Sequence, residues 1–385
     1  MSEAEKFFDK PPGRALHKKY EAESDKLPGW IINEAHLIHE ALKKGAATKE
    51  EAEGGLIENR ELLRMMRRMV QLTFFVEYSR DTARPEERGD KLTELFNQKL
   101  PGKEESGKTL ADFLAERRYG VSLAMSSLDD KTADAVRLLN TKKVPVVGWV
   151  VVDDAEGYWT NPANIKATSE KTEKIRAWAK RHELQLTAMG FDLEKPIDYI
   201  KALSRANIME TIKAIREYRA SKKKERQNGD PLKRLEDIVK KIKDAGMETE
   251  VYTMPKYLKG LLGGMDIKNV DRYVEMTYTS TLPGILRKNS RGLSALRSKG
   301  AIPALGLVTG KDSEMPGRNL TGDGKLPAHL TPEELEADIS KVLDRELNFG
   351  ERTFTLRNLY LFALNDARAA MMMDAAMERA FEKRA

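Results

Sequence analysis

The chain has 385 residues, with 67 lysines and arginines against 61 aspartates and glutamates, and so carries a formal net charge of +6. It contains no cysteine, which excludes a disulfide scaffold, a thiolate-bound metal centre and a cysteine nucleophile. Five histidines are present and no three of them stand at metal-ligand spacing, so the sequence predicts neither a metal site nor a cofactor.

The sequence predicts no membrane span and no secretory signal. The longest apolar run, Val144–Val152, is far shorter than the ~20 residues that a transmembrane helix needs. The first dozen residues are polar, unlike a secretory signal. We therefore expect a cytoplasmic protein, with association with a membrane through a partner left open.

The positive charge is concentrated in one stretch. Residues 1–118 hold 22 basic and 23 acidic side chains, whereas residues 213–243 alone hold 12 basic and 5 acidic ones. A basic helix can contact nucleic acid or an acidic membrane, but such charge runs are more often solvated helix surfaces. We therefore expect no nucleic-acid partner.

Residues 1–118 are predicted to form an all-helical N-terminal region. Apolar residues at helical spacing indicate a helix over Trp30–Leu42. A capping box at Thr48 opens a second helix, whose methionine-rich stripe runs to about Tyr78. Shorter helices are expected at Lys91–Lys99 and Thr109–Arg118. We expect no chemistry here, only a helical cap or a surface for a protein partner.

From residue 119 onward, short apolar strands alternate with helices. The predicted strands are Gly120–Met125, Val144–Val152, Gln185–Glu194, Glu248–Thr253, Arg272–Tyr278, Ile302–Val308 and Leu359–Leu364. The predicted helices are Lys131–Asn140, Ala167–His182, Pro196–Arg219, Pro231–Ala245, Leu286–Ser298 and Pro332–Leu347. This order indicates an α/β fold, a (β/α)8 TIM-type barrel over residues 119–385, with an eighth strand that is irregular or lies near Arg352–Leu356. A doubly wound sheet is the competitor, although the turn after the first strand lacks the usual glycines.

The strongest candidate for chemistry is the end of the third predicted strand. Asp192 and Glu194 are two residues apart, so both project to one face, whereas Phe191 and Leu193 project to the other. Active groups of barrels lie at the carboxyl ends of the strands. Two close carboxyls also separate each other's pKa values, so one can remain protonated as a general acid. The alternative is a structural pair bound to barrel cations or backbone donors.

Polar side chains follow other strands too. The loop after the second predicted strand holds Asp154, Tyr158, Trp159 and Asn161, and acids and amides beside aromatic rings are suited to binding sugars. The alternative is a turn in which the polar residues cap the next helix and Trp159 packs on the barrel rim. The fifth and last predicted strands lead into Tyr278 and Asp366, which complete the expected substrate-binding set.

A separate loop offers a competing chemistry. Val308–Lys311 follows the sixth predicted strand and could bind a phosphate through backbone N–H groups and the lysine. A glycine-rich turn without function explains the same residues.

The acid-x-Glu strand end resembles that of glycoside-hydrolase TIM barrels, especially the chitinase-like and lysozyme-like retaining families. The resemblance implies that Glu194 is the acid/base, Asp192 its partner and Tyr278, in Met276-Thr277-Tyr278, a polar assistant. It covers the strand end only, because Gly190 and Thr187 stand where the chitinase-type signature has acids.

A longer segment, roughly residues 119–366, resembles uncharacterised bacterial barrel proteins, some of them membrane-associated. The shared residues are Glu156-Gly157-Tyr158-Trp159-x-Asn161, Gly190-Phe191-Asp192-Leu193-Glu194, Thr277-Tyr278-Thr279-Ser280 and Gly306-Leu307-Val308-Thr309-Gly310.

Together these features predict a carbohydrate-active barrel that hydrolyses glycosides and binds a carbohydrate or another neutral small ligand. The alternatives are a non-catalytic barrel that binds a glycan or a protein partner, and a barrel that binds a phosphosugar.

Overall fold

The computed structural model describes the barrel strands and most of the helices around them. The described residues are 71–77, 84–196, 208–253, 267–276, 302–306, 332–348, 358–364 and 366–382. The helices expected before residue 71, the helix expected at 286–298 and the strand expected at 352–356 lie outside these ranges.

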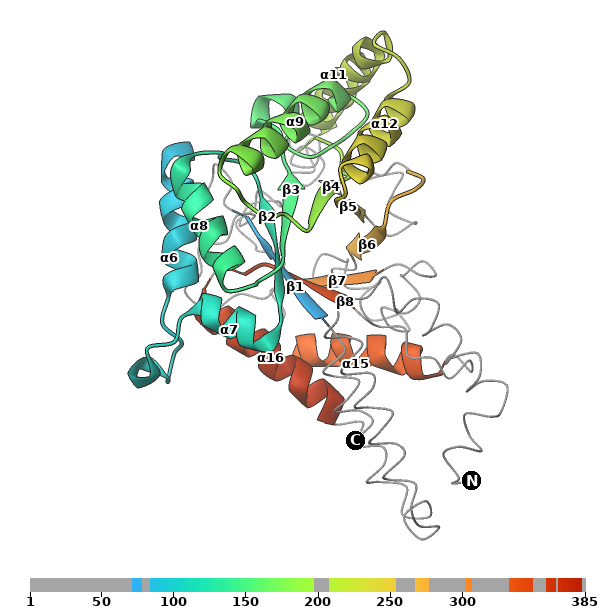
Figure 1. Ribbon diagram of the computed structural model, residues 1–385. Helices are drawn as coiled ribbons and strands as arrows, with labels where there is room; N and C mark the ends of the chain where they lie inside the picture. The colour runs from blue at the N-terminus through green and yellow to red at the C-terminus, as the bar shows by residue number, and fades with distance from the viewer. Residues whose placement is uncertain are drawn as a thin grey trace, which may run out of the picture. The chain divides into compact units, whose positions relative to one another are not determined.

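Eight parallel strands close into a barrel in the order in which they occur along the chain (Figure 1). Each strand pairs in parallel with the next, as expected for successive strand–helix units. The predicted (β/α)8 fold class is thereby confirmed. The strands are β1 (Gln71–Val76), β2 (Gly120–Ala124), β3 (Val146–Val150), β4 (Ala188–Asp192), β5 (Glu248–Thr253), β6 (Arg272–Met276), β7 (Ile302–Gly306) and β8 (Asn358–Phe362).

The first strand corrects the sequence prediction. Residues 71–76 were expected to continue a helix to about Tyr78, but they form β1, which pairs with β2. At the other edge of β1, the Leu364 amide donates a hydrogen bond to the Phe75 carbonyl oxygen over 2.8 Å. Leu72–Val76 is a short apolar run buried on both faces, and periodicity alone cannot separate such a strand from a buried helix. The barrel therefore includes elements that precede residue 119.

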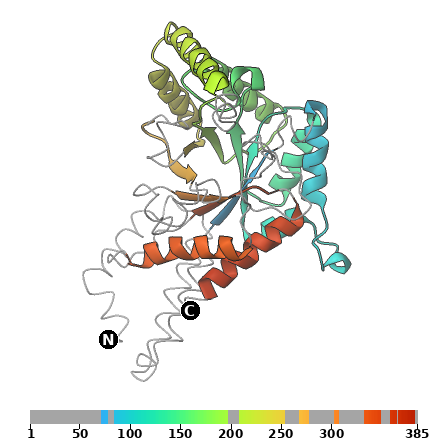
Figure 2. The same ribbon diagram turned by 180° about the vertical axis from the view of Figure 1, so that it is seen from behind.

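Helices cover the outside of the barrel between successive strands, as Figures 1 and 2 show for α6 to α12. The helices are α6 (Arg88–Asn97), α7 (Leu110–Arg117), α8 (Asp130–Thr141), α9 (Ile165–Arg181), α11 (Ile208–Arg226), α12 (Pro231–Asp244), α15 (Pro332–Asn348) and α16 (Ala367–Glu382). The first two of these confirm the helices expected near Lys91–Lys99 and Thr109–Arg118.

Local sequence signals set where these helices begin. Thr109 and Asp112 form a reciprocal capping box at the start of α7. Asp129 accepts a hydrogen bond of 2.7 Å from the Thr132 amide and so caps α8. At α12, Asp230 is the cap and a proline follows at the first helical position, which suits its fixed φ.

The residue contacts divide the chain into two units. One consists of Leu72–Leu335 and Asn358–Asp374 and contains nearly the whole barrel. The other consists of Met1–Gln71, Glu336–Arg357 and Ala375–Ala385, and within it Arg379 donates to Glu336 over 2.7 Å.

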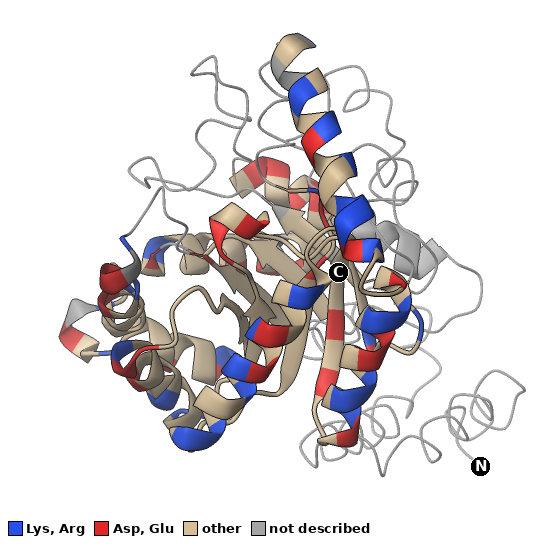
Figure 3. Cartoon of the chain, turned by 90° about the horizontal axis from the view of Figure 1, so that it is seen from above, with Lys and Arg blue, Asp and Glu red and all other residues tan. Residues whose placement is uncertain are grey.

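The basic stretch coincides with α11 and α12. Lysines and arginines outnumber acids in both helices, and Figure 3 shows that helices of the chain carry basic and acidic residues on the same segment. One acid of this stretch is buried: Glu225 accepts hydrogen bonds from the Lys166 amide over 3.0 Å and from Arg234 over 2.5 Å. Glu225 therefore joins α11 to α9 and α12, so some charged residues of this stretch hold the helices together.

Candidate functional site

Asp192 and Glu194 lie at the carboxyl end of β4, where the sequence predicted them. Asp192 is the last residue of the strand, and both side chains are buried, with 3% and 7% of their surfaces exposed. The strand is the fourth of the barrel rather than the third, because β1 had been taken for a helix.

The alternation along β4 points both acids into the barrel. A Cβ added to Gly190 would lie 2.3 Å from the Tyr252 hydroxyl oxygen, and Tyr252 belongs to the cluster of side chains that fills the barrel. The side-chain direction at position 190 is therefore inward. Because strands alternate with a period of two, Asp192 and Glu194 share this direction.

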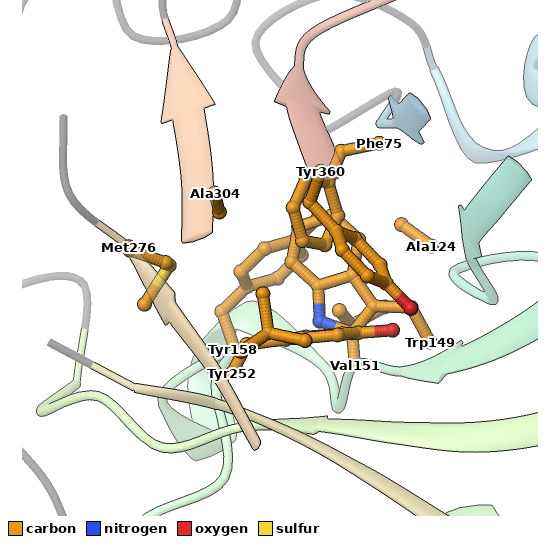
Figure 4. Close-up of a cluster of buried hydrophobic side chains, with 10 residues drawn as sticks. Phe75, Ala124, Trp149, Val151, Tyr158, Tyr252, Met276, Ala304 and Tyr360 are labelled. Atoms are coloured by element: carbon orange, nitrogen blue, oxygen red, sulfur yellow. The ribbon is translucent and has the colours of Figure 1, made fainter. Parts of the chain in front are cut away.

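Beneath the acids lies a layer of aromatic rings, shown in Figure 4. Phe75 is at its centre, with ring centroids 4.8 Å from Tyr252, 5.3 Å from Tyr360 and 5.4 Å from Trp149. Such offset and edge-on ring pairs are favourable arrangements. We call Phe75, Trp149, Tyr252 and Tyr360 the aromatic floor.

A buried polar network supports the floor from below. Glu250 is fully buried and stands two residues before the strand partner of Asp192. Its carboxylate accepts hydrogen bonds from Tyr360 over 2.6 Å, from Tyr252 over 3.0 Å and from Arg272 over 2.8 Å. Burial raises the pKa of Glu250, and the Arg272 charge partly opposes the rise. This acid has partners on three strands, so we interpret it as structural.

The sequence analysis missed a third inward-facing acid at this end of the barrel. Glu77 directly follows β1, two residues after the floor residue Phe75, and so shares its inward direction. The signal that could have found it is the run Leu72-Thr73-Phe74-Phe75-Val76 ending on an acid. We call Glu77, Asp192 and Glu194 the acid cluster.

The three carboxyls of the acid cluster hold their protons unusually strongly. Burial, reinforced by the charge of Glu77, raises the pKa of Glu194 to about 8. Burial raises the pKa of Glu77 to about 7, with Tyr158 and Arg88 opposing the rise and Asp154 adding to it. The pKa of Asp192 lies well above its usual range because of burial and the neighbouring charges of Glu194 and Glu77. Near neutral pH the cluster can therefore both donate and accept protons.

The loop after β3 brings Tyr158 to the acid cluster. Gly157 and Tyr158 both adopt left-handed backbone, with φ of 103° and 65°, and left-handed geometry is costly for a tyrosine. The turn follows the short helix Asp154–Glu156, and the Val152 amide donates to the Tyr158 carbonyl oxygen over 2.9 Å. The Tyr158 ring is buried in the barrel cluster, with Trp159 half-buried against it.

The two asparagines of this loop hold the turn together. Asn161 is buried, and its side chain donates to the Trp159 carbonyl oxygen over 2.8 Å and accepts from the Ala163 amide over 3.0 Å. Asn164 likewise bonds backbone groups of the loop. For Asn161 the structure thus shows the turn-forming role that the sequence left as the alternative.

Several polar atoms around the acid cluster are buried without a partner. Within the part of the chain that the structure describes, no hydrogen bond is formed by Asp192 Oδ1, Trp149 Nε1 or Thr160 Oγ1. The Tyr158 hydroxyl, by contrast, interacts with Glu77. Buried polar groups are normally paired, so three such atoms on β3, β4 and the loop between them mark a place where a ligand or water completes the bonding.

The other expected site residues stand apart from this group. The Asp366 side chain accepts a 2.6 Å hydrogen bond from the Ala369 amide and caps α16. Tyr278 and the loop Val308–Lys311 lie outside the described residues, so the predicted assistant and the phosphate loop remain predictions.

In the described ranges, no three histidines, aspartates or glutamates are grouped so that they could hold a metal ion. Among the same residues, no helix is long and apolar enough to cross a membrane.

No protein-family model and no curated protein matches the chain. The chain is similar in structure to a chitinase from Chromobacterium violaceum, with 12% identity, a TM-score of 0.42 and coverage of 81% of this chain and 98% of the chitinase. It is also similar to a D-psicose 3-epimerase, with 8% identity, a TM-score of 0.36 and coverage of 82% and 98%. A broad-specificity endoglucanase from an uncultured bacterium matches with 11% identity, a TM-score of 0.36 and coverage of 82% and 96%. Barrels of this kind host many chemistries, so what the site can do has to come from its own residues.

Proposed function

We propose that the protein hydrolyses a glycosidic bond at the carboxyl end of its barrel, with Glu194 as the proton donor and Asp192 as the stabilising partner. The observation that most supports this proposal is the protonation of Glu194. It is buried, faces the barrel interior and has a pKa of about 8, so it carries a proton at neutral pH. A carboxylic acid in that state can protonate the oxygen of a leaving sugar.

Glu77 supplies the second carboxyl that such a reaction requires. It faces the same interior from β1, and burial raises its pKa to about 7, so near neutral pH it can ionise and act as a base. As a base, Glu77 takes a proton from water while the water oxygen bonds to the anomeric carbon. The bond to the leaving oxygen breaks at the same time, and Glu194 gives its proton to that oxygen. A separation of ~6.5–9.5 Å favours this inverting route, and ~5–5.5 Å favours direct attack by Glu77 with retention.

The aromatic floor suits the rest of a sugar. A pyranose has an apolar ring face that packs on aromatic rings, while its hydroxyls need polar partners. Trp149 offers an unpaired indole N–H, and Trp159 is half-buried beside the same cluster. Tyr158, Trp159 and Asp154 are the loop residues that we assign to substrate binding.

The test is hydrolysis of a panel of chromogenic glycosides and polysaccharides by the wild-type chain and two variants. We expect Glu194→Gln to lose roughly 10²–10⁴-fold in turnover, the usual contribution of a general acid, while retaining folding and binding. Glu156→Gln is the matched control, because Glu156 is exposed on the loop after β3. Wild-type turnover in Glu194→Gln would overturn the assignment, and binding without hydrolysis across the panel would favour the non-catalytic alternative.

A further inference from the structure

We propose that the site is built for a sugar unit with a free, protonated amino group, and that Asp192 receives the ammonium. The inference rests on the proposed function in taking the ligand to be a sugar, and it goes further in naming the charge of that sugar.

The first argument is the balance of charge. The acid cluster places three inward-facing carboxyls from β1 and β4 within electrostatic range of one another, and Asp154 adds a fourth carboxyl near Glu77. Arg88 is the cation that acts on Glu77, and Lys171 faces Asp153 at the adjoining helix α9. On β5, the next strand after β4, Glu250 is matched by its own arginine below the floor. Among the described residues that shift the pKa of Asp192, none is a cation.

The second argument is the set of unpaired buried atoms. Asp192 Oδ1 is an acceptor with no donor, and the indole N–H of Trp149 is a donor with no acceptor. Both residues are at least nine-tenths buried, with 3% and 2% exposed. Figure 4 shows the Trp149 nitrogen turned into the cluster of interior side chains. An ammonium supplies N–H donors and a positive charge to Asp192, and a neighbouring sugar hydroxyl accepts from Trp149.

The third argument is the surroundings of the ammonium. The floor beneath Asp192 is aromatic, and ring faces attract cations.

Ammonium binding also agrees with the proposed roles of the other acids. When the cation pairs with Asp192, that carboxyl gives up its proton to solvent and becomes negative. The carboxylate and the ammonium balance each other's charge, so burial continues to keep the pKa of Glu194 raised. Glu194 then remains the acid of the reaction.

The experiment compares three β-1,4-linked tetrasaccharides that differ only at carbon 2. Glucosamine carries an ammonium there, N-acetylglucosamine a neutral amide and glucose a hydroxyl. Calorimetry at about pH 6, in two buffers of different ionisation enthalpy, measures affinity and the protons released. We expect the glucosamine oligomer to bind at least ten-fold more tightly than the other two, and it alone to release about one proton.

Asp192→Asn is the decisive variant, because it preserves the shape of the side chain and removes the acid. We expect it to lose about ten-fold or more in affinity for the glucosamine oligomer, to lose much less for the glucose oligomer and to abolish proton release. Glu156→Gln again serves as the exposed control on the same side of the barrel. Equal affinity for the three oligomers, or unchanged proton release in Asp192→Asn, would overturn the inference.

Hydrolysis of the same oligomers separates this inference from the proposed function. Tight, proton-linked binding of the glucosamine oligomer without cleavage of any oligomer supports the inference and contradicts the hydrolase. Cleavage of a neutral oligomer, without tighter binding of the glucosamine oligomer, supports the hydrolase and contradicts the inference.

Discussion

Three carboxyls with raised pKa values give the site its character at the scale of single residues. The pKa of Glu77 rises to about 7 and that of Glu194 to about 8, whereas a less buried acid that accepts a hydrogen bond from a cation has its pKa lowered. Asp112, paired with Lys142 outside the barrel, shows the usual behaviour, with a pKa of about 2. The acid cluster therefore opposes folding at neutral pH, which is a common property of functional sites.

This has a consequence for stability that can be measured. Both the folded and the unfolded chain hold these protons below about pH 4.5, but only the folded chain holds them between there and pH 7 to 8. Stability must then fall as the pH rises through this window, by at most about 1.4 kcal/mol per pH unit for each carboxyl. We predict that Glu194→Gln becomes more stable than the wild type from pH 5 to pH 8, as measured by urea unfolding at each pH. A constant difference across the range would contradict this, and Glu156→Gln should follow the wild type.

The sequence predicts Asp192 and Glu194 well because their pattern is local. Two acids alternate with two apolar residues shortly before a proline, and that spacing predicts their common direction. Glu77 was missed because its direction depends on β1 being a strand, which only pairing with β2 and β8 decides. Asn161 was ambiguous because capping and ligand binding use the same amide.

At the scale of elements, the Tyr252 side chain of β5 lies so close to the backbone of β4 that a side chain at position 190 would collide with it. A Cβ at position 190 would lie 2.3 Å from the hydroxyl oxygen of Tyr252 and 2.6 Å from its Cζ. The ring cannot move aside easily, because its hydroxyl is hydrogen-bonded to Ser122 over 2.7 Å and to Glu250 over 3.0 Å.

We predict that Gly190→Ala lowers the free energy of unfolding by about 1–3 kcal/mol or more, the usual cost of overpacking. The variant should also lose activity, since Tyr252 belongs to the floor below Asp192. Gly246→Ala is the comparison, because a Cβ there meets nothing within 4 Å and the change tests only the left-handed backbone, at about 1 kcal/mol. A Gly190→Ala protein as stable as the wild type would show that the floor can rearrange.

At the scale of the whole molecule, barrel closure depends on β1. This strand precedes the segment in which the sequence first shows strands alternating with helices. The β-rich pattern is plain from residue 119, yet the strand that closes the barrel is at residues 71–76. The seven strands that carry apolar runs between turn signals could be predicted. The remaining strand, β1, could not be predicted, because the residues on either side of it along the chain have a helical sequence pattern.

We therefore predict that a chain starting at Tyr119 does not fold. It lacks β1, α6 and α7, so β2 and β8 would present unpaired edges, which promote aggregation. The full chain should unfold cooperatively on heating, as followed by circular dichroism, and the shortened chain should show no such transition. A cooperative transition and an intact barrel spectrum for the shortened chain would contradict the prediction.

Trp149 is an intrinsic fluorophore in the aromatic floor of the proposed site. The chain has four tryptophans, and Trp149 is the one whose indole nitrogen is buried without a partner in the described interior beneath the acid cluster. Indole emission responds to the polarity and hydrogen bonding around that nitrogen. Ligand binding at the site can therefore be followed by the emission wavelength and intensity of the intrinsic tryptophan fluorescence. Replacing Trp149 with phenylalanine identifies the part of the signal that comes from Trp149.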